Sequence, residues 1–198
     1  MTTLMLASSS KIRAQILLSA GFNVEVVHAP FDEALVAHPV ASKRAVGRAL
    51  GKAQAAKNTI GRWVLGCDQV VEFNGVLYGK PKNASAQVEQ LMALRGQQHS
   101  LHCGYAIVAP SGKVYTGTEK TSLRMRSDIS EAEVKAYVAT GEGSTCAGGY
   151  AIEGHGSFLF LKTVGDWNNI LGLPLFRIVE QLRILGWRYG DNGFGVYE

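Results

Sequence analysis

Short apolar runs and longer amphipathic stretches follow one another through the first third of the chain. The apolar runs at residues 4–7, 22–28 and 63–67 predict buried strands. Residues 12–20 and 42–58 instead repeat apolar side chains at three- and four-residue spacing, which predicts helices. Strands and helices therefore alternate in this part of the sequence.

The middle of the chain carries two hairpin patterns. Asn74-Gly75 separates the apolar runs 70–73 and 76–78, and an Asn-Gly turn between such runs is a strong hairpin signal. A longer hairpin is predicted over residues 100–126, with its turn at 110–112. Caps and apolar spacing predict three further helices and a strand, at residues 83–94, 130–139, 174–185 and 158–164. This order of elements favours an α/β fold with a mixed central sheet and flanking helices.

Composition limits the class of protein. The chain has 198 residues, of which 46% are hydrophobic and 18% charged. So high an apolar content excludes intrinsic disorder, and no apolar run approaches the roughly 18 residues that a membrane span requires. The length suits one domain over residues 1–198, in which residues 187–198 are predicted to form a C-terminal tail.

Three cysteines, Cys67, Cys103 and Cys146, are widely spaced. Their number and spacing fit neither a disulfide framework nor a zinc motif, and we interpret them as small core residues. A reducing cytoplasm is therefore the expected location.

The charge of the chain is concentrated in its first half. Residues 1–100 hold 11 Lys/Arg against 6 Asp/Glu, whereas residues 101–198 hold 9 against 10. Between Lys43 and Arg62 there are six basic residues and no acidic one. A local basic stretch indicates an anionic partner, which leaves a nucleotide and a nucleic acid as alternatives.

Ser8-Ser9-Ser10 and Arg13 stand where the first strand passes into the first helix. Hydroxyl groups, free backbone N–H groups and the helix dipole form an anion site at such a turn, to which an arginine adds charged hydrogen bonds. A serine-capped surface helix is the alternative for this motif alone. The patterns GxxxxGK[ST] and GxGxxG are absent, which argues against a P-loop enzyme and a Rossmann dehydrogenase.

Asp68 follows an apolar strand, where a side chain is expected to reach a ligand crevice. A carboxylate there can orient water or hold a hard metal ion, or simply cap a turn. Lys52 and Lys80 suit a polyphosphate if they converge on the same crevice. Asp32-Glu33 either binds Mg²⁺ or begins a turn, and the histidine spacing gives no zinc motif.

Short motifs occur in a fixed order between residues 4 and 185. They are Leu6-Ala7-Ser8-Ser9-Ser10-Lys11-Ile12-Arg13, Asp32-Glu33, Ala49 to Ala53 around Lys52, Gly66-Cys67-Asp68-Gln69, Gly79-Lys80-Pro81, Leu94 to His99, Ala147 to Gly154, and Gly172-Leu173-Pro174-Leu175. As a set they resemble the motifs of the Maf family of nucleoside triphosphate pyrophosphatases. The resemblance implies two lobes around a nucleotide cleft, of the Maf/ITPase type.

The resemblance also implies a reaction, namely cleavage between the α- and β-phosphates of a nucleoside triphosphate to give a monophosphate and pyrophosphate. Asp68 would then be the general base or would position the water, and Glu33 with Asp68 would bind a divalent cation, Mg²⁺ or Mn²⁺. The residues expected to bind the phosphates are Ser8, Ser10, Arg13, Lys52 and Lys80. No membrane partner is expected, and the oligomeric state stays open, with a homodimer among the alternatives.

Base preference depends on a few further positions. Gln69 and Glu153 resemble the 7-methyl-GTP branch of the family, and we favour that branch over the dTTP/UTP branch. A carboxylate can accept hydrogen bonds from guanine N1–H and N2–H₂. Ile12 departs from the family, which has proline followed by arginine or tryptophan there, and Arg95 replaces a serine. A basic nucleic-acid-binding module, using residues 43–62, is the remote alternative.

Overall fold

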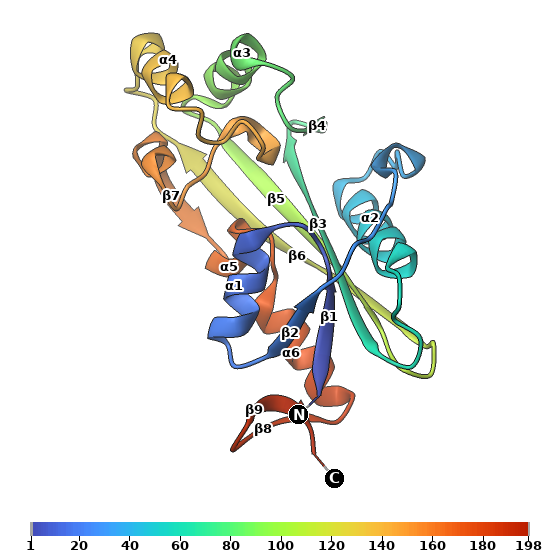
Figure 1. Ribbon diagram of the computed structural model, residues 1–198. Coiled ribbons are helices and arrows are strands. Elements are labelled where there is room, and N and C mark those ends of the chain that lie inside the picture. Colours follow the sequence, from blue (N-terminus) through green and yellow to red (C-terminus); the bar gives the residue numbers. More distant parts are fainter. Residues whose placement is uncertain (1, 198) are drawn as a thin grey trace.

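A computed structural model describes residues 2–197 and contains a seven-stranded mixed sheet (Figure 1). Its strands are β1 (Thr3–Ala7), β2 (Asn23–Val26), β3 (Trp63–Phe73), β4 (Val76–Tyr78), β5 (Gln98–Val108), β6 (Val114–Met125) and β7 (Phe160–Val164). Their order is β2-β1-β3-β5-β6-β7, and β4 pairs with β3. β1 is parallel to β2 and β3, whereas the other pairs are antiparallel. The predicted mixed sheet is confirmed.

The helices lie close to their predicted positions, except for the short helix at residues 167–170, which was not predicted. They are α1 (Lys11–Ser19), α2 (Ala41–Ala55), α3 (Ala84–Leu94), α4 (Glu131–Ala139), α5 (Trp167–Ile170) and α6 (Leu175–Ile184). Polar caps fix where the helices start, because Ser10, Asn83 and Ser130 each accept a hydrogen bond from an N–H of the first turn. No helix within residues 2–197 is long and apolar enough to cross a membrane.

Successive side chains of β1 point to opposite faces of the sheet, and each face packs against different helices. Leu4 and Leu6 pack in a cluster with α1 and α6, whereas Met5 and Ala7 pack in a cluster with α2. A third cluster, at the far end of β3, β5 and β6, is covered by α3 and α4 (Figure 1). The long central strands therefore join two regions of core.

The edge of β3 has a gap in the middle of the strand. β1 pairs with β3 only as far as Gly66, and β4 pairs with it only from Val71 onward. Within the described residues, no strand pairs with residues 67–70 on that side. Asp68 lies in this gap, so the prediction that it follows the end of its strand was wrong. The strand that ends there is β1, at Ala7, and its end opens the crevice.

The predicted C-terminal tail was also wrong for the residues that the structure describes. The strands β8 (Trp187–Gly190) and β9 (Gly193–Val196) form a hairpin, whereas Glu198 lies outside the described residues. Trp187 is fully buried and Phe194 is 5% exposed, and both belong to the cluster around α1 and α6. Burial of these two rings supplies the packing energy that holds the hairpin on the domain.

His99 is buried in the core region covered by α3 and α4, beside Tyr150 of the motif at residues 147–154. Its Nε2 lies 2.7 Å from the hydroxyl oxygen of Tyr150, and its exposed fraction is 2%. Burial disfavours the imidazolium form and lowers the pKa of His99 from 6.5 to about 4. At neutral pH the ring is therefore uncharged.

We expect this histidine to make the stability of the protein depend on pH. Above about pH 6.5 His99 is neutral in both the folded and the unfolded chain, so it adds no pH dependence. As the pH falls from about 6.5 to about 4, only the unfolded chain takes up the proton, which lowers the free energy of unfolding by about 1.4 kcal/mol per pH unit and about 3 kcal/mol in total. Urea unfolding at about pH 5 and about pH 7.5 measures this loss.

His99→Gln should reduce that difference by about 2 kcal/mol, because glutamine keeps a hydrogen-bonding group without a charge that titrates. The exposed His155 gives the matched control, since His155→Gln should keep the wild-type dependence. An unchanged dependence in His99→Gln would contradict the assignment.

Candidate active site

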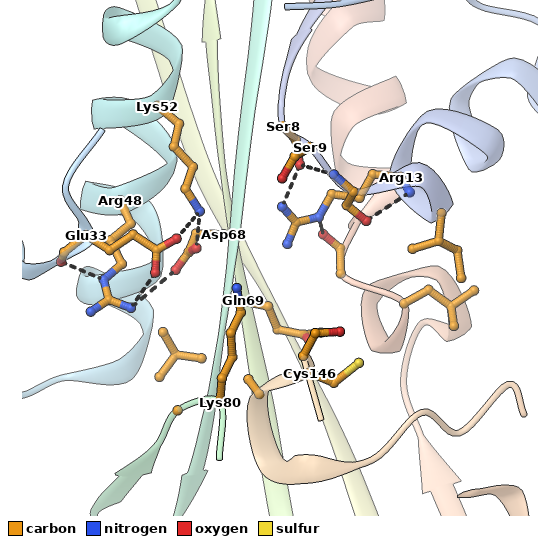
Figure 2. A pocket seen from close by; sticks show the side chains of 18 of the residues that line it. Ser8, Ser9, Arg13, Glu33, Arg48, Lys52, Asp68, Gln69, Lys80 and Cys146 are labelled. Carbon is orange, nitrogen blue, oxygen red and sulfur yellow. Dashed lines mark hydrogen bonds and ion pairs between the residues drawn. The ribbon is translucent and has the colours of Figure 1, made fainter. Parts of the chain in front are cut away.

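A cleft of about 1190 Å³ opens at the gap in the sheet. It is lined by α1 and the turn before it, the basic face of α2, the middle of β3, the end of β4 and the glycine-rich segment around residue 146. Every residue predicted for the site lines this cleft, namely Ser8, Ser10, Ile12, Arg13, Glu33, Lys52, Asp68, Gln69, Lys80 and Glu153. Figure 2 shows Lys52 and Asp68 on one side of it and the Ser8–Arg13 turn on the other.

A charged cluster forms where α2 faces the middle of β3. The Lys52 ammonium lies 2.6 Å from Oδ1 of Asp68 and 2.8 Å from Oε1 of Glu33. Glu33 is brought there by η1 (Glu33–Leu35), a single 3₁₀ turn in the loop before α2. Oδ2 of Asp68 is buried and has no hydrogen-bond partner among the described residues. The cluster therefore leaves one carboxylate oxygen available to a ligand.

The two carboxyl groups of this cluster differ in pKa because they differ in burial. Burial raises the pKa of Asp68, whose side chain is 7% exposed, and the charge and hydrogen bond of Lys52 oppose this only in part. Burial acts in the same direction on Glu33, but Lys52 and Arg48 outweigh it and lower the pKa of Glu33. A carboxylate with a raised pKa accepts a proton more readily, which suits Asp68 to general base catalysis.

Arg13 connects the serine turn, residues 8–10, to other parts of the domain by hydrogen bonds. Its Nε donates to the carbonyl of Gly172 over 2.7 Å, and its Nη1 donates to Oγ of Ser8 and to the carbonyl of Cys67 over 3.1 and 2.8 Å. Ser10 is the N-cap of α1. Within the described residues, Nη2 of Arg13 makes no hydrogen bond. Arg13 therefore anchors the turn and keeps one amino group for an anion.

Lys80 and Glu153 also line the cleft, Lys80 after the end of β4 and Glu153 after the segment around residue 146. Lys80 follows β4, and Figure 2 shows its side chain extending toward Asp68. Its charge contributes to the lowered pKa of Glu33, which agrees with that direction. Both Lys80 and Glu153 are exposed, and they form no ion pair within residues 2–197. Their charged groups are accessible to a ligand.

Gln69 faces away from the charged cluster. Successive side chains of a strand point to opposite faces of the sheet, so Gln69 leaves β3 on the side opposite to Asp68. Its Nε2 donates to the carbonyls of Asn169 and Ile170 over 2.7 and 3.0 Å. These bonds attach α5 to β3, and they occupy both N–H groups of the amide.

Arg48 is a site residue that the sequence prediction left out. Its Nη1 lies 3.3 Å from Oε2 of Glu33 and 4.0 Å from Oδ2 of Asp68. Its place one helical turn before Lys52 puts both cations on one face of α2, and this spacing is the signal that could have identified it.

Two oxygen-donating side chains, Glu33 and Asp68, are the candidate ligands of a divalent cation. Residues 2–197 contain no group of three or more His, Cys, Asp or Glu that could hold a metal ion. Mg²⁺ is often held by one or two protein carboxylates, while substrate phosphates and water complete its shell. Oδ2 of Asp68 accepts no hydrogen bond within the described residues, and the Glu33 carboxylate lies close to the same lysine, so the two carboxylates fit that donor set.

Comparisons with known proteins identify the family of the chain. The model of the family described as Maf-like protein matches residues 3–185. A nucleoside triphosphate pyrophosphatase of Synechococcus elongatus is 37% identical over 187 residues, which cover 92% of this chain and 94% of that protein. A dTTP/UTP pyrophosphatase of Bacillus cereus is 35% identical over 184 residues, covering 92% and 95%. A nucleoside-triphosphatase/dITP/XTP pyrophosphatase structure from Mycobacterium abscessus aligns over 65% of this chain and 76% of its own, with 15% identity and a TM-score of 0.43.

Proposed function

The chain belongs to the Maf-like protein family, and we propose that it hydrolyses nucleoside triphosphates to monophosphates and pyrophosphate, with dTTP and UTP as preferred substrates. It is a hydrolase of phosphoanhydride bonds, like the relatives that carry the name nucleoside triphosphate pyrophosphatase. One observation carries the mechanism: in the cleft, Lys52 holds one oxygen of Asp68 at 2.6 Å, while within the described residues the other oxygen accepts no hydrogen bond and has the Arg48 guanidinium at 4.0 Å.

The cleft offers positive charge on several sides of this carboxylate. Lys52 approaches from α2, Lys80 from the end of β4, and Nη2 of Arg13 from α1. The serine turn adds hydroxyl groups at the start of α1, where the helix dipole favours an anion. We propose that these groups bind the triphosphate and neutralise the charge that develops on its oxygens during phosphoryl transfer.

We assign to Asp68 the activation of the attacking water. Its free oxygen accepts a proton from the attacking water, whose oxygen forms a bond to the α-phosphorus. The bond from the α-phosphorus to the bridging oxygen then breaks, and pyrophosphate leaves with the electron pair. Lys52, bonded to the other carboxylate oxygen, holds Asp68 in position and stabilises its charged form.

We propose that a divalent cation, Mg²⁺ or Mn²⁺, binds with the substrate at Glu33 and Asp68. When bound, it would neutralise phosphate charge and polarise phosphoryl oxygens. Glu33 suits this role because its lowered pKa keeps the carboxylate ionised.

The preference for pyrimidines replaces the 7-methyl-GTP preference predicted from Gln69 and Glu153. Relatives that match this chain over 92% of its length carry the name dTTP/UTP pyrophosphatase. The amide nitrogen of Gln69 is bonded to the main chain and is not free to bind a base. The exposed carboxylate of Glu153 can accept a hydrogen bond from N3–H of thymine or uracil.

Pyrophosphate release across a panel of nucleotides, with and without Mg²⁺, tests this proposal. We expect kcat/KM for dTTP and UTP to exceed that for 7-methyl-GTP and the standard purine triphosphates by about tenfold or more. Chelation of the metal should remove most of the activity. A higher kcat/KM for 7-methyl-GTP would overturn the pyrimidine assignment, and release of inorganic phosphate instead of pyrophosphate would overturn the reaction.

The basic stretch at residues 43–62 fits this function better than it fits nucleic-acid binding. The side chains of Arg48 and Lys52 are 20% and 15% exposed, and both pair with carboxylates inside the cleft. A nucleic-acid-binding surface would instead present its cations to solvent along the backbone of the polymer.

A further inference from the structure

A loop of residues 30–40 carries Glu33 into the cleft and lies along the basic face of α2. Its regular structure is limited to the turn η1, and Leu35 and Val40 in it are exposed. None of residues 30–40 is fully buried, so the core of the domain does not hold this loop in place. The position of the Glu33 carboxylate must depend on the contacts that the loop makes with α2.

Two arginines of α2 bind the backbone of this loop. Nε of Arg48 donates to the carbonyls of Glu33 and Val36 over 3.1 and 3.3 Å. Nε of Arg44, one turn earlier, donates to the carbonyl of His38 over 2.8 Å. Hydrogen bonds from a charged donor are stronger than neutral ones, so these contacts fix the course of the loop.

Two glycines let the loop approach the helix closely. A Cβ atom on Gly47 would lie 2.8 Å from Cγ1 of Val36, and one on Gly51 would lie 2.2 Å from the ring of Phe31. Glycine inside a helix is destabilising relative to alanine. The close packing of the loop gives these positions a physical reason to be glycine.

Arg48 also reaches the carboxylates. Its Nη1 lies 3.3 Å from Oε2 of Glu33, while Lys52 lies 2.8 Å from Oε1 of the same group. Both oxygens of Glu33 are therefore held, one by each cation. A guanidinium group can make these contacts and the backbone contacts together because its donors form a rigid, planar fork.

We propose that Arg48 is a positioning residue for the hydrolysis, which docks the loop of residues 30–40 on α2 and fixes the Glu33 carboxylate beside the Lys52–Asp68 pair. The expected effect on kinetics rests on the proposed function. The expected effect on the loop rests only on the contacts between the loop and α2. Arg48 lies 3.3 Å from Glu33 but 4.0 Å from Asp68, so we expect it to act chiefly through Glu33, and its removal should cost activity mainly while Glu33 is present.

A double-mutant cycle tests this dependence. Arg48→Gln should lower kcat by about tenfold or more, with KM changed by less than about threefold. Glu33→Ala should lower kcat at least as much, and the double variant should lie within about twofold of Glu33→Ala. Lys43→Gln is the matched control, because it removes an exposed cation from the same helix and should retain wild-type kinetics. Multiplicative losses in the double variant, or a loss mainly in KM, would overturn the proposal.

Hydrogen exchange of the peptide spanning residues 30–40 provides a readout that does not need catalysis. Arg48→Gln should speed exchange in this peptide severalfold, whereas Lys43→Gln should leave it unchanged. Equal exchange in both variants would overturn the docking role. If the wild-type protein hydrolyses no nucleotide, the proposed function fails, while the exchange measurement still decides whether Arg48 holds the loop.

Discussion

Asp68→Asn is expected to lower kcat for pyrophosphate release by about a thousandfold, within the range that loss of a general base produces. Asparagine matches the shape of aspartate and can still accept a hydrogen bond from Lys52, which lies 2.6 Å from Oδ1. It cannot take up a proton from water, and it binds a divalent cation less strongly. Lys52 keeps Glu33 as an ionic partner at 2.8 Å, so no unpaired charge is left in the cleft.

Two further measurements separate a chemical effect from a structural one. The Tm of Asp68→Asn should stay close to that of the wild type, and KM for the preferred nucleotide at saturating Mg²⁺ should change little, because the groups assigned to phosphate binding remain. Glu72→Gln, on the same strand and outside the cleft, is the matched control and should keep full activity. Near-wild-type turnover by Asp68→Asn would refute the assignment of Asp68.

Local sequence patterns predicted most elements of the fold but misplaced Asp68 within its strand. The apolar run that ends at Cys67 and the hairpin run that begins at Val70 were interpreted as separate strands, whereas β3 continues through both. Asp68 and Gln69 interrupt the apolar pattern because they lie where β3 has no neighbour on one edge. That gap is created by the end of β1 and the start of β4, and such long-range pairing cannot be deduced from residues 63–73 alone.

The C-terminal hairpin was missed for a similar reason. Trp187 and Phe194 are separated by glycines and polar residues, so the local pattern indicates loose structure. Their burial depends on a surface formed by the beginning of the chain, where Phe22 forms a bridge with Phe194 and its ring contacts both aromatic groups. Residues distant in sequence supply this partner, and a local pattern gives no sign of it.

The candidate site was more predictable than the contacts inside it. Family motifs identified ten residues that the structure places in one cleft, but they gave neither Arg48 nor the engagement of Gln69 with the main chain. Arg48 reaches Glu33 only because the loop before α2 folds back on the helix. Side-chain partners of this kind follow from the packing of separate elements, which spacing along the sequence does not specify.

The position of Lys52 depends on how closely α2 packs on the sheet. The buried face of α2 is a row of alanines, Ala41, Ala45, Ala49 and Ala53. Opposite them, Gly66 on β3 and Gly104 on β5 have no side chain. A Cβ atom on Gly66 would lie 2.1 Å from the carbonyl oxygen of Ala49, and one on Gly104 would lie 2.4 Å from backbone atoms of Ala45 and Val46. A helix backbone cannot yield locally as a flexible side chain can, so the helix itself would have to move.

Gly104→Ala and Gly66→Ala are therefore each expected to destabilise the protein by about 3 kcal/mol, as overpacking of a rigid interface does. For a chain of this size that corresponds to a fall in Tm of about 6–12 °C, measurable by thermal unfolding. Because Lys52 moves with α2, kcat should also fall by about tenfold or more at temperatures where the variants remain folded. Gly195→Ala is the control, since the atoms nearest to its Cβ would belong to Thr2 at an ordinary distance of 3.4 Å, and its Tm should match the wild type. A wild-type Tm for Gly104→Ala would mean that α2 can shift without loss of stability. In that case there would be no reason to expect Arg48 and Lys52 to be held rigidly beside Asp68.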